Sequence, residues 1–269
     1  MTTETAGLVR SIDGTTIAFE RRGEGPPIIL VDPAGGYSGF DTIRGLSPLL
    51  ADEFTVYCYD RRGRGGSTDT LPYAIGREVE DLAAVVAEAD GHASVYGFSS
   101  GALLACHAAA DGVPIDRLVL LEPPFSSPGV LEADEGLGDE VAGLVAADRR
   151  DEAVTHWLTA VGVPAEIIAQ MEPVRPALEA VAHTLVYDAA IATAPLTDLV
   201  GKVTTETLVL DSDGSDPALS RAAVECARAL PNARHRTLPG DWHGVDDEVL
   251  APAIKEFLLG EGWSGGTSP

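Results

Sequence analysis

Short apolar runs rich in β-branched residues alternate with segments of helical periodicity along most of the 269-residue chain. One helical segment repeats apolar residues at i, i+3, i+4 and i+7, namely Val79, Leu82, Ala83 and Val86. This alternation is typical of an α/β fold with a mostly parallel sheet. The eight expected strands are residues 7–11, 15–21, 28–31, 54–59, 93–97, 117–121, 206–210 and 234–238.

One long stretch interrupts the alternation. Residues 125–200 contain no strand pattern, whereas Val154, Trp157, Leu158 and Val161 have helical spacing. A helical excursion between two strands predicts a cap, or lid, over the carboxyl edge of the sheet, where open α/β sheets bind ligands. We therefore expect a core of residues 1–124 and 201–262, a helical cap of residues 125–200 and a flexible tail of residues 263–269.

The charge balance is strongly acidic, with 18 Lys and Arg against 42 Asp and Glu, a net charge of -24. Such a surface repels phosphate backbones and anionic lipids, so neither nucleic acid nor a membrane is an expected partner. No apolar run approaches the roughly 18 residues of a membrane span, and no signal-peptide pattern is seen, which predicts a cytoplasmic protein. Three scattered cysteines, Cys58, Cys106 and Cys226, predict neither disulfides nor a metal site.

The motif with the clearest chemistry is Gly97-Phe98-Ser99-Ser100-Gly101, which follows an expected strand and precedes a helix pattern. A serine on so tight a strand-to-helix turn needs small neighbours, because side chains on both sides would collide. The helix amino terminus then directs free N–H groups to where negative charge develops. Ser99 is therefore the candidate nucleophile.

A serine hydroxyl needs a base to remove its proton, and His243 is the candidate. It lies in a loop directly after the last expected strand, at the same sheet edge as Ser99. The other histidines lie in a turn, in helix patterns, in the cap or inside a strand, and are interpreted as surface or packing residues: His92, His107, His156, His183 and His235.

Together these features resemble the α/β-hydrolase fold: a nucleophile turn after the fifth of eight strands, a helical insertion after the sixth and a histidine after the eighth. Residues 30–36 (LVDPAGG) stand where family members carry an oxyanion loop, and residues 59–67 (YDRRGRGGS) match the family's D-x-R-G-x-G-x-S turn. The basic residues of that turn are interpreted as structural ion pairs and not as an anion site. The resemblance covers residues 8 to 259.

By position, the resemblance implies the backbone N–H groups of Ala34 and Ser100 as oxyanion donors. Asp32-Pro33 replaces the usual His-Gly of the family. Asp32 could therefore place a carboxylate near the site or cap the loop.

The acid that orients the histidine has two candidate positions. In most α/β-hydrolases it follows the seventh strand, where Asp213 and Asp216 stand. Glu122-Pro123-Pro124 instead ends the sixth strand, and the arrangement resembles haloalkane dehalogenases and zearalenone-type lactone hydrolases. A carboxylate at the end of an apolar strand needs a buried partner, which favours Glu122.

The expected function is hydrolysis of a small or medium ester or lactone by a monomer or homodimer, without cofactor or metal. Serine at the elbow argues against dehalogenase and epoxide hydrolase chemistry in this fold. Alternatives on the same scaffold are a C–C bond hydrolase, a non-hydrolytic cyclase or lyase, and a slow-turnover ligand receptor. Candidate pocket residues, besides Asp32, are Tyr37, Phe98, Trp157, Met171 and Trp242.

Overall fold

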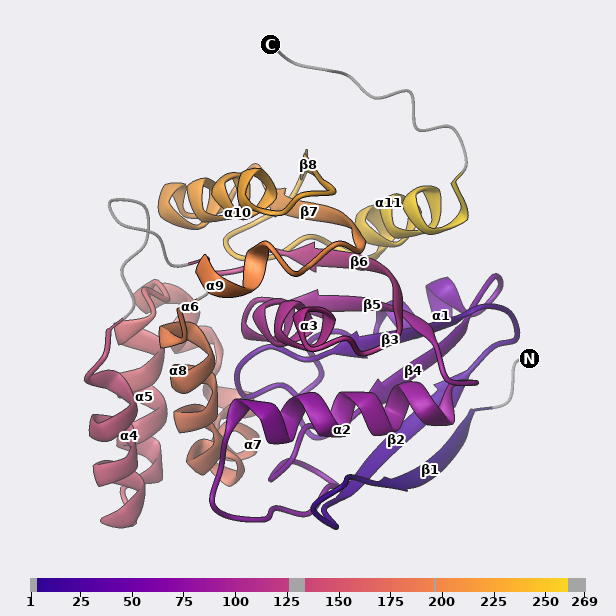
Figure 1. Cartoon of the computed structure of the whole chain (residues 1–269). Coiled ribbons are helices and arrows are strands. Elements are labelled where there is room, and N and C mark those ends of the chain that lie inside the picture. The colour runs from indigo at the N-terminus through magenta and orange to yellow at the C-terminus, as the bar shows by residue number, and fades with distance from the viewer. Residues whose placement is uncertain (1–3, 126–133, 196, 261–269) are drawn as a thin grey trace.

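A single eight-stranded sheet organises the computed structural model, which describes residues 4–125, 134–195 and 197–260 (Figure 1). The strand order is β1-β2-β4-β3-β5-β6-β7-β8. β2 pairs antiparallel with β1 and with β4, and all other neighbours are parallel. The eight expected strands and the mostly parallel sheet are confirmed. Their bounds are β1 (Thr5–Arg10), β2 (Thr16–Arg22), β3 (Pro27–Val31), β4 (Thr55–Tyr59), β5 (Ala93–Phe98), β6 (Ile115–Leu121), β7 (Glu206–Ser212) and β8 (Ala233–Leu238).

The central strands are apolar almost throughout because helices cover both faces of the sheet. One face packs against α2 (Ile75–Glu88), α3 (Ser100–Ala110) and α10 (Pro217–Ala229). The other packs against α1 (Leu46–Leu50) and α11 (Asp247–Leu259). Side chains alternate between these two cores, as Ile29 and Val31 face the first and Ile28 and Leu30 the second.

The described residues between β6 and β7 form helices and contain no strand. These are α4 (Leu137–Ala146), α5 (Arg150–Ala160), α6 (Ala165–Gln170), η1 (Glu172–Val174), α7 (Arg175–Ala180), η2 (Ala182–Thr184), α8 (Leu185–Thr193) and α9 (Thr197–Val200). We call residues 134–195 the helical insertion.

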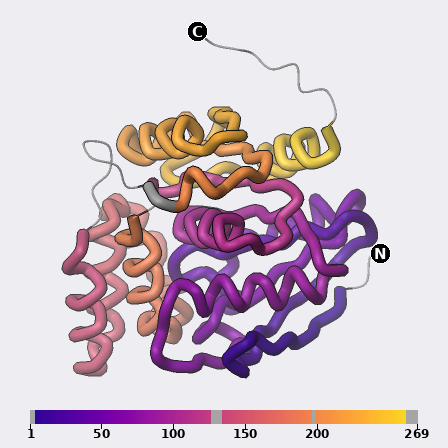
Figure 2. The backbone as a smooth tube through the Cα atoms, viewed as in Figure 1, coloured from indigo at the N-terminus to yellow at the C-terminus, as the bar shows by residue number. Residues whose placement is uncertain are grey.

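Helices α4, α5, α7 and α8 gather at one side of the sheet around an apolar cluster of their own, which includes Val141, Trp157 and Leu185 (Figures 1 and 2). The domain division at residues 124 and 201 stays a prediction. The expected tail, 263–269, lies outside the described residues, as do residues 126–133 and 196 of the expected cap and 261–262 of the expected core. No helix in the described part of the chain has the length and apolar character needed to cross a membrane.

Candidate active site

Ser99 lies at the turn between β5 and α3 with φ 53° and ψ -120°. The local sequence permits this turn because a Cβ atom on Gly97 would lie 2.6 Å from the carbonyl oxygen of Gly101. A Cβ atom on Gly101 would lie 2.5 Å from the carbonyl oxygen of Val31 on β3. Glycine on both sides therefore allows the close approach of β3, β5 and α3 that presents the Ser99 hydroxyl.

Three side chains from distant parts of the chain form one hydrogen-bonded series. Oγ of Ser99 lies 3.0 Å from Nε2 of His243, and Nδ1 of His243 lies 2.5 Å from Oε2 of Glu122. An ionised carboxylate only accepts hydrogen bonds, so Nδ1 carries the imidazole proton. Nε2 is then left as the acceptor for the Ser99 hydroxyl.

Glu122 is fully buried at the end of β6, with 0% of its surface exposed. Its backbone N–H donates to Leu210 on β7, and its Oε1 accepts from the N–H of Ser212. The carboxylate is therefore fixed by the neighbouring strand through one oxygen and offers the other to His243. These contacts provide the partners that a buried charge requires.

The backbone is unusual at each of these three residues. Ser99, Glu122 and His243 have φ values of 53°, 44° and 50°, and only two other described non-glycine residues have positive φ. Non-glycine residues in this region of φ are disfavoured, and they cluster at functional sites where the surrounding structure holds them.

The two other candidate acids lie apart from the imidazole. Oδ1 of Asp216 caps the amino terminus of α10 by accepting from Ala218 N–H at 2.7 Å. Oδ1 of Asp213 accepts from Gly240 N–H at 3.0 Å, and both side chains belong to exposed residues. The structure thus brings Glu122, and neither aspartate, into contact with His243.

The remaining histidines have other surroundings. His92 and His156 are exposed beside carboxylates, and His235 on β8 contacts Asp211. His107 and His183 are partly buried in helical segments, and burial lowers the pKa of both imidazoles. Within the described residues, none of these five imidazoles is hydrogen-bonded to a serine.

The two expected oxyanion donors come from different segments of the chain. Ser100 begins α3, and Ala34 lies in the loop after β3. Within the described residues, no backbone hydrogen bond uses the N–H of either residue. The loop continues with Gly35 at φ 72°, where a Cβ atom would lie 2.9 Å from Cδ2 of Leu178 in the helical insertion.

Asp32, one of the pocket candidates, is buried in the loop after β3. The residue is 0% exposed, Oδ1 accepts from Thr42 Oγ1 at 2.7 Å, and Oδ2 pairs with Arg44 at 3.0 Å. Burial raises the pKa of this carboxyl group, while Arg44 and Thr42 oppose the rise. Both oxygens of the Asp32 carboxylate therefore form contacts within the loop after β3.

The turn after β4 contains buried ion pairs, in agreement with the structural interpretation. Arg62 is bidentate to Asp81 on α2, at 2.7 and 2.8 Å. Arg61 is bidentate to Glu78 on the same helix, at 2.7 and 2.8 Å. Arg64 reaches Asp188 on α8 at 2.6 Å.

The aromatic pocket candidates divide into two groups. Phe98 and Trp242 border the imidazole of His243, with ring centroids 5.0 and 5.4 Å from it. Trp157 and Met171 pack in the apolar cluster of the helical insertion, and Tyr37 donates to Ala177 of that insertion at 3.1 Å. The first group borders the imidazole of His243, and the second lies in the helical insertion or contacts it.

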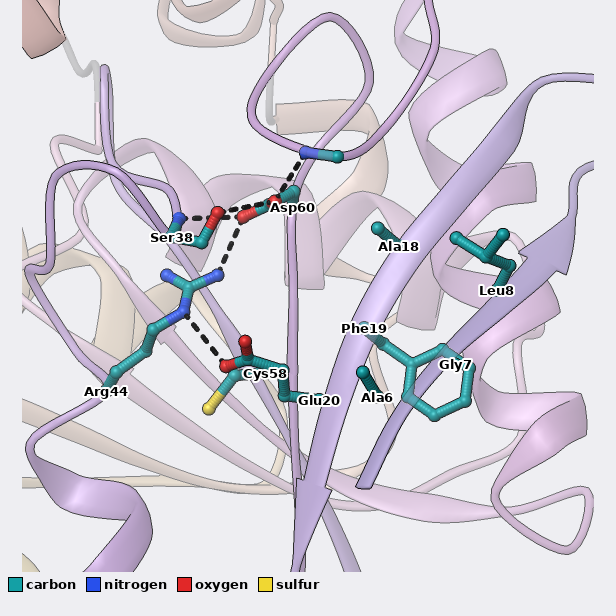
Figure 3. A pocket seen from close by; sticks show the side chains of 11 residues that line it. Ala6, Gly7, Leu8, Ala18, Phe19, Glu20, Ser38, Arg44, Cys58 and Asp60 are labelled. Atoms are coloured by element: carbon teal, nitrogen blue, oxygen red, sulfur yellow. Dashed lines mark hydrogen bonds and ion pairs between the residues drawn. The ribbon is translucent and has the colours of Figure 1, made fainter. Parts of the chain in front are cut away.

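A separate cavity of about 330 Å³ lies against β1, β2 and β4 (Figure 3). In its wall, Arg44 joins Asp60 to Glu20, and Asp60 accepts from the N–H and hydroxyl of Ser38. The charged groups of this wall thus pair with one another. Ser99, Glu122 and His243 do not line this cavity.

Among the described residues, no group of three or more His, Cys, Asp or Glu side chains could hold a metal ion. All three cysteines are free thiols and buried. Burial raises the pKa of the Cys58 thiol to about 12, which makes it a poor nucleophile at neutral pH.

Sequence reasoning missed one carboxylate near the site. Asp188 on α8 is fully buried, and its Oδ1 accepts from the hydroxyl of Ser100, the residue after Ser99, at 2.7 Å. The available signal was a single acidic residue within an apolar helical run, Leu185-Val186-Tyr187-Asp188-Ala189. Such a residue must find a buried partner, but the run does not say which.

The sheet order, the strained serine turn and the helices on both faces define the α/β-hydrolase class of enzymes. A family model described as "Alpha/beta hydrolase family" matches residues 28–253, and the chain belongs to this family.

A solved structure of an alpha/beta hydrolase from Sphaerobacter thermophilus DSM 20745 is 44% identical, with a TM-score of 0.86, and the alignment covers 94% of this chain and all of that one. The enol-lactonase from Burkholderia xenovorans LB400 shares the fold at 20% identity and a TM-score of 0.72, over 93% of this chain and 99% of that one. A curated protein from Escherichia coli O103:H2 (strain 12009 / EHEC), named "Putative carbamate hydrolase RutD", is 36% identical over 91 residues. That match spans 33% of this chain and about a third of the relative, 34% of its length.

Proposed function

We propose that this chain is a serine hydrolase that cleaves a small or medium carboxylic ester or lactone through an acyl-enzyme. The observation that carries the proposal is the series from Ser99 through His243 to Glu122, with contacts of 3.0 and 2.5 Å. The series supplies a nucleophile, its base and the group that fixes the tautomer of the base.

In the first step, Oγ of Ser99 attacks the carbonyl carbon while its proton moves to Nε2 of His243. The carbonyl π electrons move to oxygen, and the N–H groups of Ala34 and Ser100 stabilise that oxyanion. A single oxyanion donor contributes about 3 kcal/mol in related acyl-transfer sites. Glu122 stabilises the imidazolium that forms.

In the second step, the carbon–oxygen bond to the leaving alcohol breaks, and the imidazolium gives its proton to the alcohol oxygen. The acyl group remains on Ser99, and in a lactone the alcohol stays tethered to it. Water then attacks the acyl carbon as His243 takes its proton, and collapse of this intermediate releases the acid and restores the Ser99 hydroxyl.

The surroundings favour an apolar acyl or alcohol group of modest size. The aromatic rings of Phe98 and Trp242 border the imidazole, and the apolar cluster of the helical insertion packs against Ala34 in the loop after β3. The net charge of -24 disfavours acidic carrier proteins as substrates through repulsion.

The test compares the native protein with Ser99→Ala for turnover of p-nitrophenyl acetate, butyrate and octanoate, and for labelling by a fluorophosphonate probe. A δ-lactone and a carbamate join the panel, the latter because the curated relative is named for carbamate hydrolysis. We expect Ser99→Ala to abolish labelling and to lower turnover by about 10⁶-fold. Ser94→Ala, on the same strand, is the control and retains both. A native protein that the probe does not label would overturn the proposal.

A further inference from the structure

A buried ionic cluster joins the helical insertion to the core. It consists of Arg61, Arg64, Glu78 and Asp188, all at most 2% exposed as side chains, and we call it the Asp188 cluster. Asp188 pairs with Arg61 at 2.7 Å through Oδ1 and with Arg64 at 2.6 Å through Oδ2. The two guanidinium groups come from the turn after β4. The two carboxylates come from α2 and α8.

The cluster holds the loop after β3. Arg64 donates from Nη1 to the carbonyl oxygens of Pro33 at 2.7 Å and Gly36 at 3.2 Å. Arg61 donates from Nη1 to the carbonyl oxygen of Asp32 at 3.3 Å. These carbonyl groups lie on both sides of Ala34, so the guanidinium groups fix the peptide segment that carries its N–H.

The same carboxylate also holds the second donor segment. Oδ1 of Asp188 accepts from Oγ of Ser100 at 2.7 Å, and Ser100 is the first residue of α3. Asp188 is therefore hydrogen-bonded directly to Ser100. It is linked to the loop that contains Ala34 by two successive hydrogen bonds through Arg64. Its contacts converge on both segments expected to bind the oxyanion.

The carboxylate must be charged to make these contacts. Burial alone would raise the pKa of Asp188, but Arg61 and Arg64 hold it below the ordinary value. An amide at this position could retain one acceptor oxygen, but it could not neutralise two guanidinium groups. Replacement by Asn should therefore loosen the Asp188 cluster without removing side-chain volume.

We propose that Asp188 is a positioning residue of the oxyanion site, which makes the geometry of the Ala34 and Ser100 donors depend on how α8 packs against the core. This inference rests on the proposed function. Small displacements of preorganised donors weaken transition-state stabilisation much more than substrate binding. The packing of the helical insertion against the core would then affect the rate of the reaction.

The test measures kcat and KM of Asp188→Asn with a p-nitrophenyl ester, and the inhibition constant of phenylboronic acid, which forms a tetrahedral adduct with the serine. We expect kcat to fall about 10- to 100-fold, since a misplacement near 1 Å can cost about 10²-fold. KM should stay within about threefold, because ground-state binding is not the term affected. Boronate affinity should weaken in parallel with kcat.

Asp81→Asn is the matched control. Asp81 is also a buried, bidentate partner of an arginine in the same turn. Among the described residues, the other hydrogen bonds of its partner Arg62 go to Asp13 and to the carbonyl oxygen of Arg77, and not to the loop after β3. Both variants should lower the melting temperature, and only Asp188→Asn should lower kcat and boronate affinity. Equal losses of kcat in the two variants, or a folded Asp188→Asn with native kcat, would overturn the inference.

Ser100→Ala decides the question if Asp188→Asn does not fold. It removes only the hydroxyl that contacts Asp188 and keeps the backbone N–H. We expect a several-fold fall in kcat matched by weaker boronate binding; native values for both would overturn the inference. A native protein without fluorophosphonate labelling would instead mean that the proposed function itself is wrong.

Discussion

Two fully buried carboxylates occupy adjacent regions of this protein and have opposite kinds of partner. Glu122 contacts an imidazole, His243, whose protonation can change during a reaction. Asp188 contacts two guanidinium groups, Arg61 and Arg64, which remain charged at all ordinary pH values. The difference teaches that burial alone does not define a role: the first carboxylate can assist proton transfer, whereas the second can only hold a geometry.

The largest effect in this comparison is expected from Glu122→Gln, which tests the role of the first carboxylate. The amide oxygen can still accept from Ser212, so the amide NH₂ would face Nδ1 and favour the wrong imidazole tautomer. We expect kcat to fall by about 10³- to 10⁴-fold with little loss of stability. Ester turnover and thermal unfolding of the same preparation provide the two measurements.

Asp216→Asn and Asp213→Asn are the matched controls, because both aspartates follow β7 and neither contacts His243. Both variants should keep near-native turnover. Near-native turnover in Glu122→Gln, combined with a large loss in either control, would assign the orienting acid to the loop after β7.

At the second carboxylate, Asp188, a large loss of stability is expected. Asp188→Ala leaves the buried side chains of Arg61 and Arg64 without their shared partner. Removing one partner from a buried ion pair typically costs about 3–5 kcal/mol, so the free energy of unfolding should fall by about that amount. Urea denaturation of Asp188→Ala and native protein measures the difference.

Glu152→Ala serves as the exposed counterpart, since Glu152 pairs with Arg149 on the surface of the helical insertion. It should change stability little, because exposed ion pairs are screened by solvent. A similar unfolding midpoint for all three proteins would show that the Asp188 cluster does not stabilise the fold.

The two regions also differ in how much the sequence revealed. Some signals are local, because each describes a constraint within a few residues. They are the glycines around Ser99, the strand before it and the two prolines after Glu122. The resemblance to the α/β-hydrolase fold then predicts the strand order and which residues meet at the strand ends. These features made it possible to predict the fold and to select Ser99, His243 and Glu122, which the structure brings into contact.

The Asp188 cluster could not be predicted in this way. Arg64 and Asp188 are 124 residues apart, and their contact exists only because α8 packs on the turn after β4. The sequence shows a basic turn and a single acid in an apolar helix, without the packing that joins them. Asp32 was ambiguous for the same reason, since its partners Thr42 and Arg44 follow from the path of the loop.

The smallest expected effect concerns His183, which lies beside the Asp188 cluster. His183 lies next to Thr184, whose hydroxyl accepts from Arg64, and burial and Arg150 lower the pKa of its imidazole. A lowered pKa in the folded state means that the unfolded chain binds the proton more readily. The contribution of His183 to stability is therefore complete above the ordinary imidazole pKa of 6.5, and it is lost as the pH falls through the lower pKa of the folded state.

We therefore expect His183→Gln to reduce the fall in melting temperature between pH 7.5 and pH 5.5. His107, whose pKa is also lowered by burial, keeps part of that fall in the variant. The control, His92→Gln, has the opposite sign because Asp116 raises the pKa of His92, so its removal should steepen the fall. An unchanged slope in His183→Gln would mean that this imidazole binds protons equally in the folded and unfolded chains.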